Sequence, residues 1–135
     1  MPWTIWGAAW VVMSAGYAYG AAAKLMGPSW LDGAALLYLL DNPLARDTLL
    51  RDWLLTLPHL PLQIATWAML GVELLFLPLA IFRRTRGWAW LMMVLVHLGL
   101  ACIMNLGDFL PCMLILHLFT FDPGWLSRPT HTQPR

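Results

Sequence analysis

Charged side chains are scarce in this chain: eight Lys and Arg and seven Asp and Glu make up 11% of its 135 residues, whereas 60% are hydrophobic. So few charges cannot cover a soluble domain, and a composition this apolar indicates an integral membrane protein. The basic residues are scattered apart from one cluster at 83–86, which excludes an extended nucleic-acid-binding surface. The expected partner is therefore the lipid bilayer, and no nucleic acid is expected.

Cysteines are also few, and the sequence predicts neither a disulfide framework nor a metal site. Cys102 and Cys112 lie in apolar segments without Cys-x-x-Cys spacing, so we interpret both as small hydrophobic residues. The aspartates between residues 32 and 52 lack metal-ligand spacing and indicate a solvated surface. The N-terminus lacks the basic stretch of a signal peptide, so the first apolar run is expected to remain as a span.

Four apolar runs predict an all-α fold, an integral membrane helical bundle of three to four spans that forms a single domain over residues 1–135. The runs cover residues 3–26, 60–82, 87–107 and 109–121. The last is the shortest, because a helix over 109–121 covers only about 20 Å of a bilayer core of about 30 Å. Residues 29–40 and 47–57 mix apolar and polar positions and predict one or two amphipathic helices at the membrane interface.

The orientation follows from the basic cluster. Arg83, Arg84 and Arg86 connect the predicted spans 60–82 and 87–107, and such clusters stay on the cytoplasmic side. The N-terminus is then cytoplasmic and the 27–59 segment extracytoplasmic. We expect the membrane to be a bacterial inner membrane.

Several short motifs stand in a fixed order along the chain. They are Tyr17-x-Tyr19-Gly20, Ala23-Lys24-Leu25, Trp30-Leu31-Asp32-Gly33, Tyr38-Leu39, Gly71-Val72-Glu73, His97, Met104-Asn105 with Phe109, and Pro123-x-Trp125. In this order they resemble the vitamin K-dependent gamma-carboxylase family, which belongs to the horizontally transferred transmembrane (HTTM) domains. The resemblance implies a truncated carboxylase-like membrane core that lacks both the first helices of the family and its large substrate-binding domain. It also implies that Lys24 matches the lysine base that starts oxygenation of reduced vitamin K.

The candidate site residues each allow two interpretations. Lys24 is a catalytic base under the resemblance, or else a structural charge that reaches the interface or pairs with a carboxylate. His97 and His117 lie in predicted spans, where neutral imidazoles can ligate a haem or a pigment or can hydrogen-bond between helices. Gly16 and Gly20 have the four-residue spacing that lets two helices pack closely.

The depth of each polar residue predicts its partner. With a rise of about 1.5 Å per residue, Glu73 and His97 fall at one level near the midplane, whereas Lys24 falls near the outer end of the first span. We therefore expect two polar layers, one of Glu73 with His97 and one of Lys24 with Asp108 or Asn105. A direct pair between Lys24 and Glu73 is not expected.

Three functions remain open. The favoured one is an accessory or structural subunit of a larger membrane protein complex, which packs on other membrane subunits through the face of Gly16 and Gly20. The second is a minimal carboxylase-like enzyme in which Lys24 acts as a base on a membrane quinone. The third is a haem- or pigment-binding subunit of an electron-transfer or light-harvesting complex, which uses His97 or His117. The sequence demands no cofactor and favours a protein that is not an enzyme.

Overall fold

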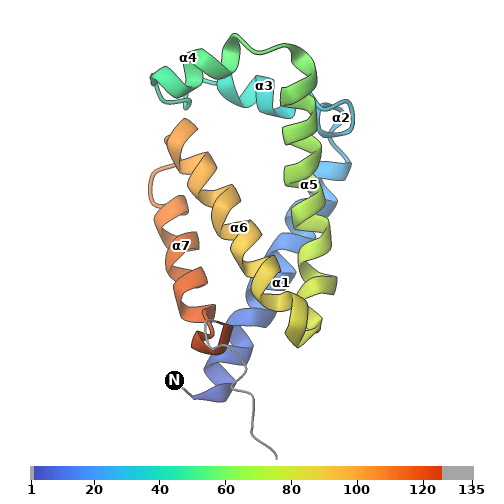
Figure 1. Ribbon diagram of the computed structural model, residues 1–135, viewed down its shortest axis with the longest axis vertical. Coiled ribbons are helices and arrows are strands. Elements are labelled where there is room, and N and C mark those ends of the chain that lie inside the picture. Colours follow the sequence, from blue (N-terminus) through green and yellow to red (C-terminus); the bar gives the residue numbers. More distant parts are fainter. Residues whose placement is uncertain (1, 126–135) are drawn as a thin grey trace, which may run out of the picture.

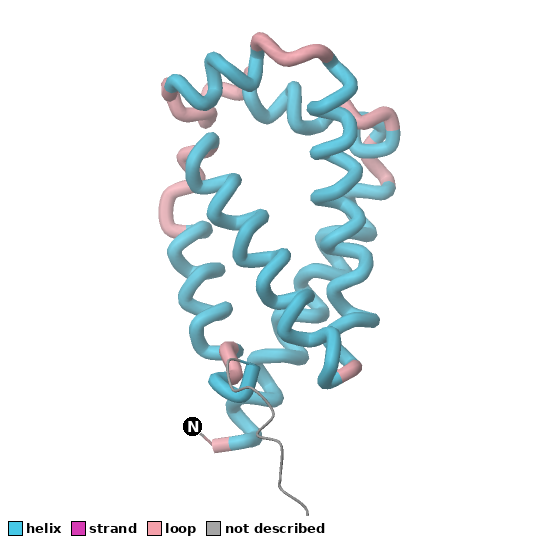
Figure 2. The backbone as a smooth tube through the Cα atoms, viewed as in Figure 1, coloured by secondary structure: helices cyan, strands magenta, loops and turns pink. Residues whose placement is uncertain are grey.

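The computed structural model describes residues 2–125, and these residues are helical almost throughout (Figure 2). The elements are α1 (Trp3–Leu25), α2 (Pro28–Leu31), α3 (Ala35–Leu40), α4 (Leu49–Leu55), α5 (His59–Ile81), α6 (Arg83–Ile103), α7 (Phe109–Thr120) and a short 3-10 helix, η1 (Pro123–Trp125). The predicted all-α class is confirmed for this part of the chain.

The four longest helices, α1, α5, α6 and α7, form an up-down-up-down ring (Figure 1). Each packs against the next in chain order, and α7 closes the ring by packing on α1. The segment between α1 and α5 carries α2, α3 and α4, which lie over the end of the bundle where α5 begins. We call this segment, residues 27–58, the cap. The start of α1 and η1 lie at the opposite end of the bundle.

Two helices of the described chain, α5 and α6, are long and apolar enough to cross a membrane. The prediction of three to four spans is therefore matched in part. Like α5, α1 has 23 residues, but its Trp, Tyr, Gly and Ser residues make it less apolar. With 12 residues, α7 is a shorter apolar helix. Length and composition alone thus make the chain compatible with a membrane protein.

The connection between α5 and α6 is shorter than the sequence predicted. The basic cluster at 83–86 was expected to form a loop, but α6 begins at Arg83, and Phe82 alone separates the two helices. Two side chains of this first turn reach back to the end of α5. The Thr85 hydroxyl donates to the Leu79 carbonyl at 2.8 Å, and Arg86 Nε donates to the Ala80 carbonyl at 2.7 Å. The last carbonyls of a helix have no partners within the helix, and here the side chains of Thr85 and Arg86 supply those partners. The chain can therefore turn into α6 without a loop.

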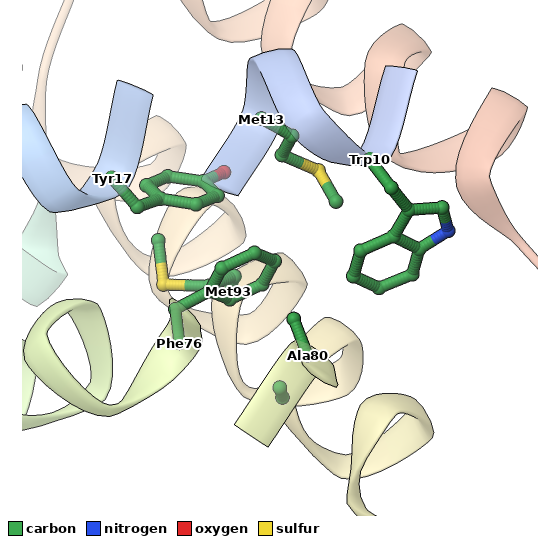
Figure 3. Packing of buried hydrophobic residues seen from close by; sticks show 7 residues of the cluster. Trp10, Met13, Tyr17, Phe76, Ala80 and Met93 are labelled. Carbon is green, nitrogen blue, oxygen red and sulfur yellow. The ribbon is translucent and has the colours of Figure 1, made fainter. Parts of the chain in front are cut away.

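The main core lies between α1, α5 and α6. Its buried members are Trp10, Met13, Tyr17, Phe76, Ala80, Ala89 and Met93 (Figure 3). Phe76 is fully buried at the centre, with the Trp10 ring stacked on it at 5.9 Å and the Tyr17 ring edge-on at 4.6 Å. Aromatic pairs at these distances add about 0.5–1.5 kcal/mol beyond their buried area. This cluster fixes α1 against the α5–α6 hairpin.

The cap bends at Gly33, where the expected single helix over 29–40 is divided into α2 and α3. Gly33 has φ +82, and a Cβ atom there would lie 2.9 Å from Gln63 Cβ on α5. Only glycine combines this backbone conformation with so close an approach. The helix expected over 47–57 is present as α4, and its N-cap residue Thr48 accepts a hydrogen bond from the Arg51 amide at 3.3 Å.

Two arginines fix the cap to itself and to the far end of α6. Arg46 Nε donates to the Met104 carbonyl at 3.0 Å, and Arg51 Nε donates to the Leu40 carbonyl at 2.7 Å. Ala45 and Met104 also form an isolated antiparallel bridge. The four aspartates of this segment are exposed, as predicted, whereas its two arginines bind backbone oxygens.

Candidate functional site

The last turn of α1 meets the middle of α5 in an ion pair. Lys24 Nζ donates to Glu73 Oε1 and lies 5.0 Å from the centre of the Trp30 ring. The Glu73 side chain is 9% exposed and the Lys24 side chain 26%. The predicted pairing of Lys24 with Asp108 or Asn105 is therefore wrong, and so is the prediction that Lys24 and Glu73 do not meet.

Lys24 and Glu73 meet because the end of α1 and the start of α5 do not lie at the same level. Glu73 lies about 21 Å along α5 from its first residue. The cap packs beside this first part of α5: Gln63 Nε2 donates to the Asp32 carbonyl at 3.1 Å, and Trp67 Nε1 donates to the Leu31 carbonyl at 3.1 Å. The end of α2 thus lies beside residues 63–67. Hence α1 stops well below the start of α5, and Lys24 is level with Glu73.

Asn105 and Asp108 lie in the connection between α6 and α7, on the other side of the bundle from the end of α1 (Figure 1). Both residues are exposed. The Asn105 amide donates to the Leu44 carbonyl at 2.8 Å, and the Asp108 carbonyl accepts from the Cys112 amide at 3.0 Å. These two residues therefore serve the connection and do not belong to the site.

His97 and His117 face each other across α6 and α7, with ring centres 5.3 Å apart. His97 Nδ1 lies 2.8 Å from the Met93 carbonyl, and His117 Nδ1 lies 2.7 Å from the Met113 carbonyl. A carbonyl oxygen only accepts, so each Nδ1 must carry the proton.

The proton on Nδ1 leaves each neutral histidine with Nε2 as an acceptor. The Tyr17 hydroxyl donates to His117 Nε2 at 3.1 Å. Both ring nitrogens of His117 therefore make hydrogen bonds. Of the two histidines, it is His97 that keeps a ring nitrogen, Nε2, to accept a hydrogen bond from a ligand. The expected layer of Glu73 with His97 is replaced by separate partners, Lys24 for Glu73 and the Met93 carbonyl for His97.

A cavity of about 360 Å³ brings these groups together. Its polar wall is made by Tyr17, Lys24, Glu73 and His97, and Gly16 and Gly20 of α1 form part of the lining. The remaining wall is apolar and comes from α1, α6 and α7: Val12, Met13, Val96, Leu100, Phe109, Met113 and Leu116. A mostly apolar cavity with a few converging polar groups is the usual form of a small-molecule site.

One polar atom of this wall lacks a partner among the described residues. Glu73 Oε2 is buried and makes no hydrogen bond, although Oε1 of the same carboxylate binds Lys24. A Cβ atom added at Gly20 would lie 3.7 Å from this oxygen. At Gly16, one turn earlier, an added Cβ atom would meet nothing within 4 Å. Among residues 2–125, neither glycine has a second helix backbone within 4 Å of its Cβ position, so their predicted role in packing against another subunit stays a prediction.

Neither the contact of Lys24 with the Trp30 ring nor the bond between Tyr17 and His117 was predicted from the sequence. Trp30 follows Lys24 by six positions, which would place it beyond the lysine on a continuous helix. The break at Gly27 and Pro28 turns the chain, so that the indole lies against the ammonium group. The Gly27-Pro28 break, which follows Lys24 after two further residues, was the available signal.

The described chain is thus an all-helical bundle with two helices suited to cross a membrane and a largely apolar cavity whose wall carries four polar side chains. Comparison with protein-family models, with curated proteins and with solved structures finds no match. Within residues 2–125, no three His, Cys, Asp or Glu side chains lie close enough to hold a metal ion.

Proposed function

We propose that this chain is an integral membrane protein that binds a lipid-soluble ligand, of the size of a membrane quinone head group, in the cavity of Lys24, Glu73 and His97. The observation that carries the proposal is the largely apolar cavity in which the polar groups of Lys24, Glu73 and His97 converge. The second oxygen of Glu73 is buried without a hydrogen bond among the described residues, so the hydrogen bonding of this carboxylate is incomplete.

The outward-facing surface of the bundle supports the membrane assignment. Only 28% of the most apolar stretch of α5 and 22% of that of α6 are buried by the rest of the chain. The core helices of soluble proteins are mostly buried, whereas these two expose large apolar side chains such as Ile64, Leu75 and Leu95. A bilayer is the solvent in which such a surface is stable.

The number and direction of the spans complete the proposal. With 23 residues, α1 is about 35 Å long, enough to cross the bilayer core, and its exposed side carries Val11 and Val12. We propose three full spans, α1, α5 and α6, with α7 entering the membrane as a fourth, shorter helix. Because basic residues favour the cytoplasmic side, we propose that the N-terminus and the α5–α6 turn with Arg83 and Arg84 face the cytoplasm of a bacterium and that the cap lies on the other side of its inner membrane.

The contacts of Lys24 favour binding over base catalysis. Glu73 and the Trp30 ring both attract a cation, so the lysine is held as a charged hydrogen-bond donor. His97 adds one acceptor to the same cavity, and the apolar wall would receive a ring or the start of a hydrocarbon tail. The geometry thus suits recognition of a polar head on an apolar molecule.

The test compares two glycine variants in protein purified from membranes into lipid nanodiscs. Gly16→Leu fills the cavity, since Gly16 lines it and has free space around it. Gly71→Leu is the matched control, because Gly71 on α5 has equally free space and does not line the cavity. We expect mass spectrometry of extracted lipids to find a quinone-sized ligand with the wild type and with Gly71→Leu, but not with Gly16→Leu. If none of the three retained a ligand or bound an added short-chain quinone or alkylphenol, the proposal would be wrong.

A second candidate is the accessory subunit favoured by the sequence. It is supported by the exposed face of α1, where Val11 and Val12 are 69% and 65% exposed and the neighbouring Gly16 leaves open space that another helix can enter. In that case, other membrane proteins co-purify with the wild type in a fixed stoichiometry, and Gly16→Leu removes them while the chain still inserts. A chain that purifies alone, with no effect of Gly16→Leu on its assembly, contradicts this role.

A further inference from the structure

We propose that a phospholipid with a net negative head group binds at the end of the bundle that carries the α5–α6 turn, in a groove beside Arg84. The groove has a volume of about 690 Å³ and lies between α6 and η1. No described residue lines both this groove and the cavity of Lys24, so the two sites are separate. The inference rests on the membrane assignment and not on the ligand of that cavity.

Arg84 is one of two arginines that the fold itself does not use. Three others, Arg46, Arg51 and Arg86, each bind a backbone carbonyl. Arg83 and Arg84 are exposed, and among residues 2–125 their side chains make neither a hydrogen bond nor an ion pair. A guanidinium group offers two parallel N–H donors that match the oxygens of a phosphate. Both arginines are therefore free to contact a lipid head group.

The surroundings of the two arginines decide between them. Arg83 lines a smaller hollow of about 330 Å³ together with Asp122. The Asp122 carboxylate repels an anion there, and one of its oxygens accepts from the Gly124 amide at 2.8 Å. The described lining of the Arg84 groove includes no acidic residue. An anionic head group is therefore favoured beside Arg84.

The order of side chains along α6 matches the parts of a phospholipid. Arg84, Trp88 and Leu91 all line the groove, and their spacing of four and three residues puts them on one face of the helix. They follow one another over about 10 Å along the helix axis. Trp88 is 65% exposed, and an indole favours the interface between head groups and hydrocarbon. The phosphate, the glycerol region and the start of an acyl chain thus each meet a suitable side chain.

The aromatic part of the groove is held in place by contacts of its own. Trp90 Nε1 donates to the His117 carbonyl at 2.8 Å, and the Trp90 ring packs on Phe121 at 5.3 Å and on Trp125 at 5.7 Å. Gly87 lets Trp125 approach α6, since a Cβ atom there would lie 3.2 Å from the indole. A surface that is already ordered loses little conformational freedom when a lipid binds to it.

The experiment titrates the full chain, purified in a mild detergent, with phosphatidylglycerol or with phosphatidylcholine of the same acyl chains. Native mass spectrometry measures the dissociation constant of the first bound lipid. Both lipids carry a phosphate, but the choline cation of the second is repelled by the neighbouring arginines. We expect the wild type to bind phosphatidylglycerol about tenfold more tightly or better, the effect of a hydrogen bond to a charged group.

Two matched variants separate the groove from the general charge of this turn. Arg84→Gln should weaken phosphatidylglycerol binding by about tenfold or more. Arg83→Gln removes the same charge one residue away and should weaken it by no more than about fivefold, the effect of one basic residue on attraction to an anionic surface. Neither side chain has a partner among the described residues, so both variants should fold.

Each other result overturns a stated part of the proposal. If the wild type binds the two lipids equally, or prefers phosphatidylcholine, the head group is wrong. Equal losses for Arg83→Gln and Arg84→Gln would show attraction by overall charge and no site in the groove. If glycerol phosphate displaced the lipid at an equal concentration, the role of the acyl chain would be overturned. Retention of a quinone-sized ligand in the cavity is measured separately, so failure of the proposed function is distinguishable from failure of this site.

Discussion

Replacing Lys24 with methionine is expected to destabilise the bundle more than replacing Glu73 with glutamine, because the two partners of the ion pair differ in burial. The Glu73 side chain is 9% exposed, and Lys24→Met leaves its charge without any partner. The Lys24 side chain is 26% exposed and also contacts the Trp30 ring, so after Glu73→Gln the ammonium keeps part of its stabilisation.

The magnitudes follow from this asymmetry. Breaking a buried ion pair by removing one partner costs about 3–5 kcal/mol, and the partial exposure of Lys24 puts Lys24→Met near the lower limit, about 3 kcal/mol. We expect about 1 kcal/mol for Glu73→Gln, because a polar amide remains beside the lysine. The double variant leaves no charge unpaired and should lose only about 1–2 kcal/mol, so the two changes are strongly non-additive.

The assay is equilibrium unfolding in mixed micelles with a rising fraction of sodium dodecyl sulfate. The nine tryptophans of the chain provide the fluorescence signal. A coupling energy of about 2 kcal/mol or more between the two positions is expected from the cycle of single and double variants. Additive losses, or a larger loss for Glu73→Gln than for Lys24→Met, would refute the argument that the buried carboxylate depends on the lysine.

Two further predictions concern the cap. Thr66→Val should cost about 1–3 kcal/mol in the same assay, because the buried Thr66 hydroxyl accepts from the Leu36 amide at 3.1 Å, whereas Thr66→Ser keeps the bond and most of the stability. Gly33→Ala should destabilise the protein by about 2 kcal/mol or more, because φ is +82 and Gln63 lies in contact. Gly107→Ala, with φ +55 and free space, should cost only about 1 kcal/mol. Equal losses for the two glycines would contradict the role of the Gln63 contact.

The long helices could be predicted from the sequence because apolar runs with clear breakers define them. The run 3–26 was expected as a span, and the structure has α1 over Trp3–Leu25, which stops just before Gly27 and Pro28. The start of α6 was missed because a basic cluster was interpreted as a loop. Arginine is a good helix former, and Arg86 binds a carbonyl at the end of α5, which the charge pattern alone does not reveal.

The candidate site was only partly predictable for a similar reason. Lys24, Glu73 and His97 were recognised as costly residues inside apolar runs, and the structure places all three on one cavity. Their pairing was wrong because counting residues along each helix assumes that all helices start at a common plane. The cap shifts α1 relative to α5, and this shift depends on side-chain to backbone hydrogen bonds such as that from Trp67 to Leu31, which no periodicity shows.

The one-residue turn at Phe82 has a mechanical consequence for the bundle. The hairpin is joined tightly at this end, and α5 and α6 separate toward the cap (Figure 1). Near the cap, an apolar groove of about 440 Å³ lies between them. The spacing of α5 and α6 is therefore fixed at the turn, and any change in this spacing is greatest at the helix ends near the cap. Arg46 holds the end of α6 through the Met104 carbonyl, so the width of the groove at this end depends on the contacts that the cap makes.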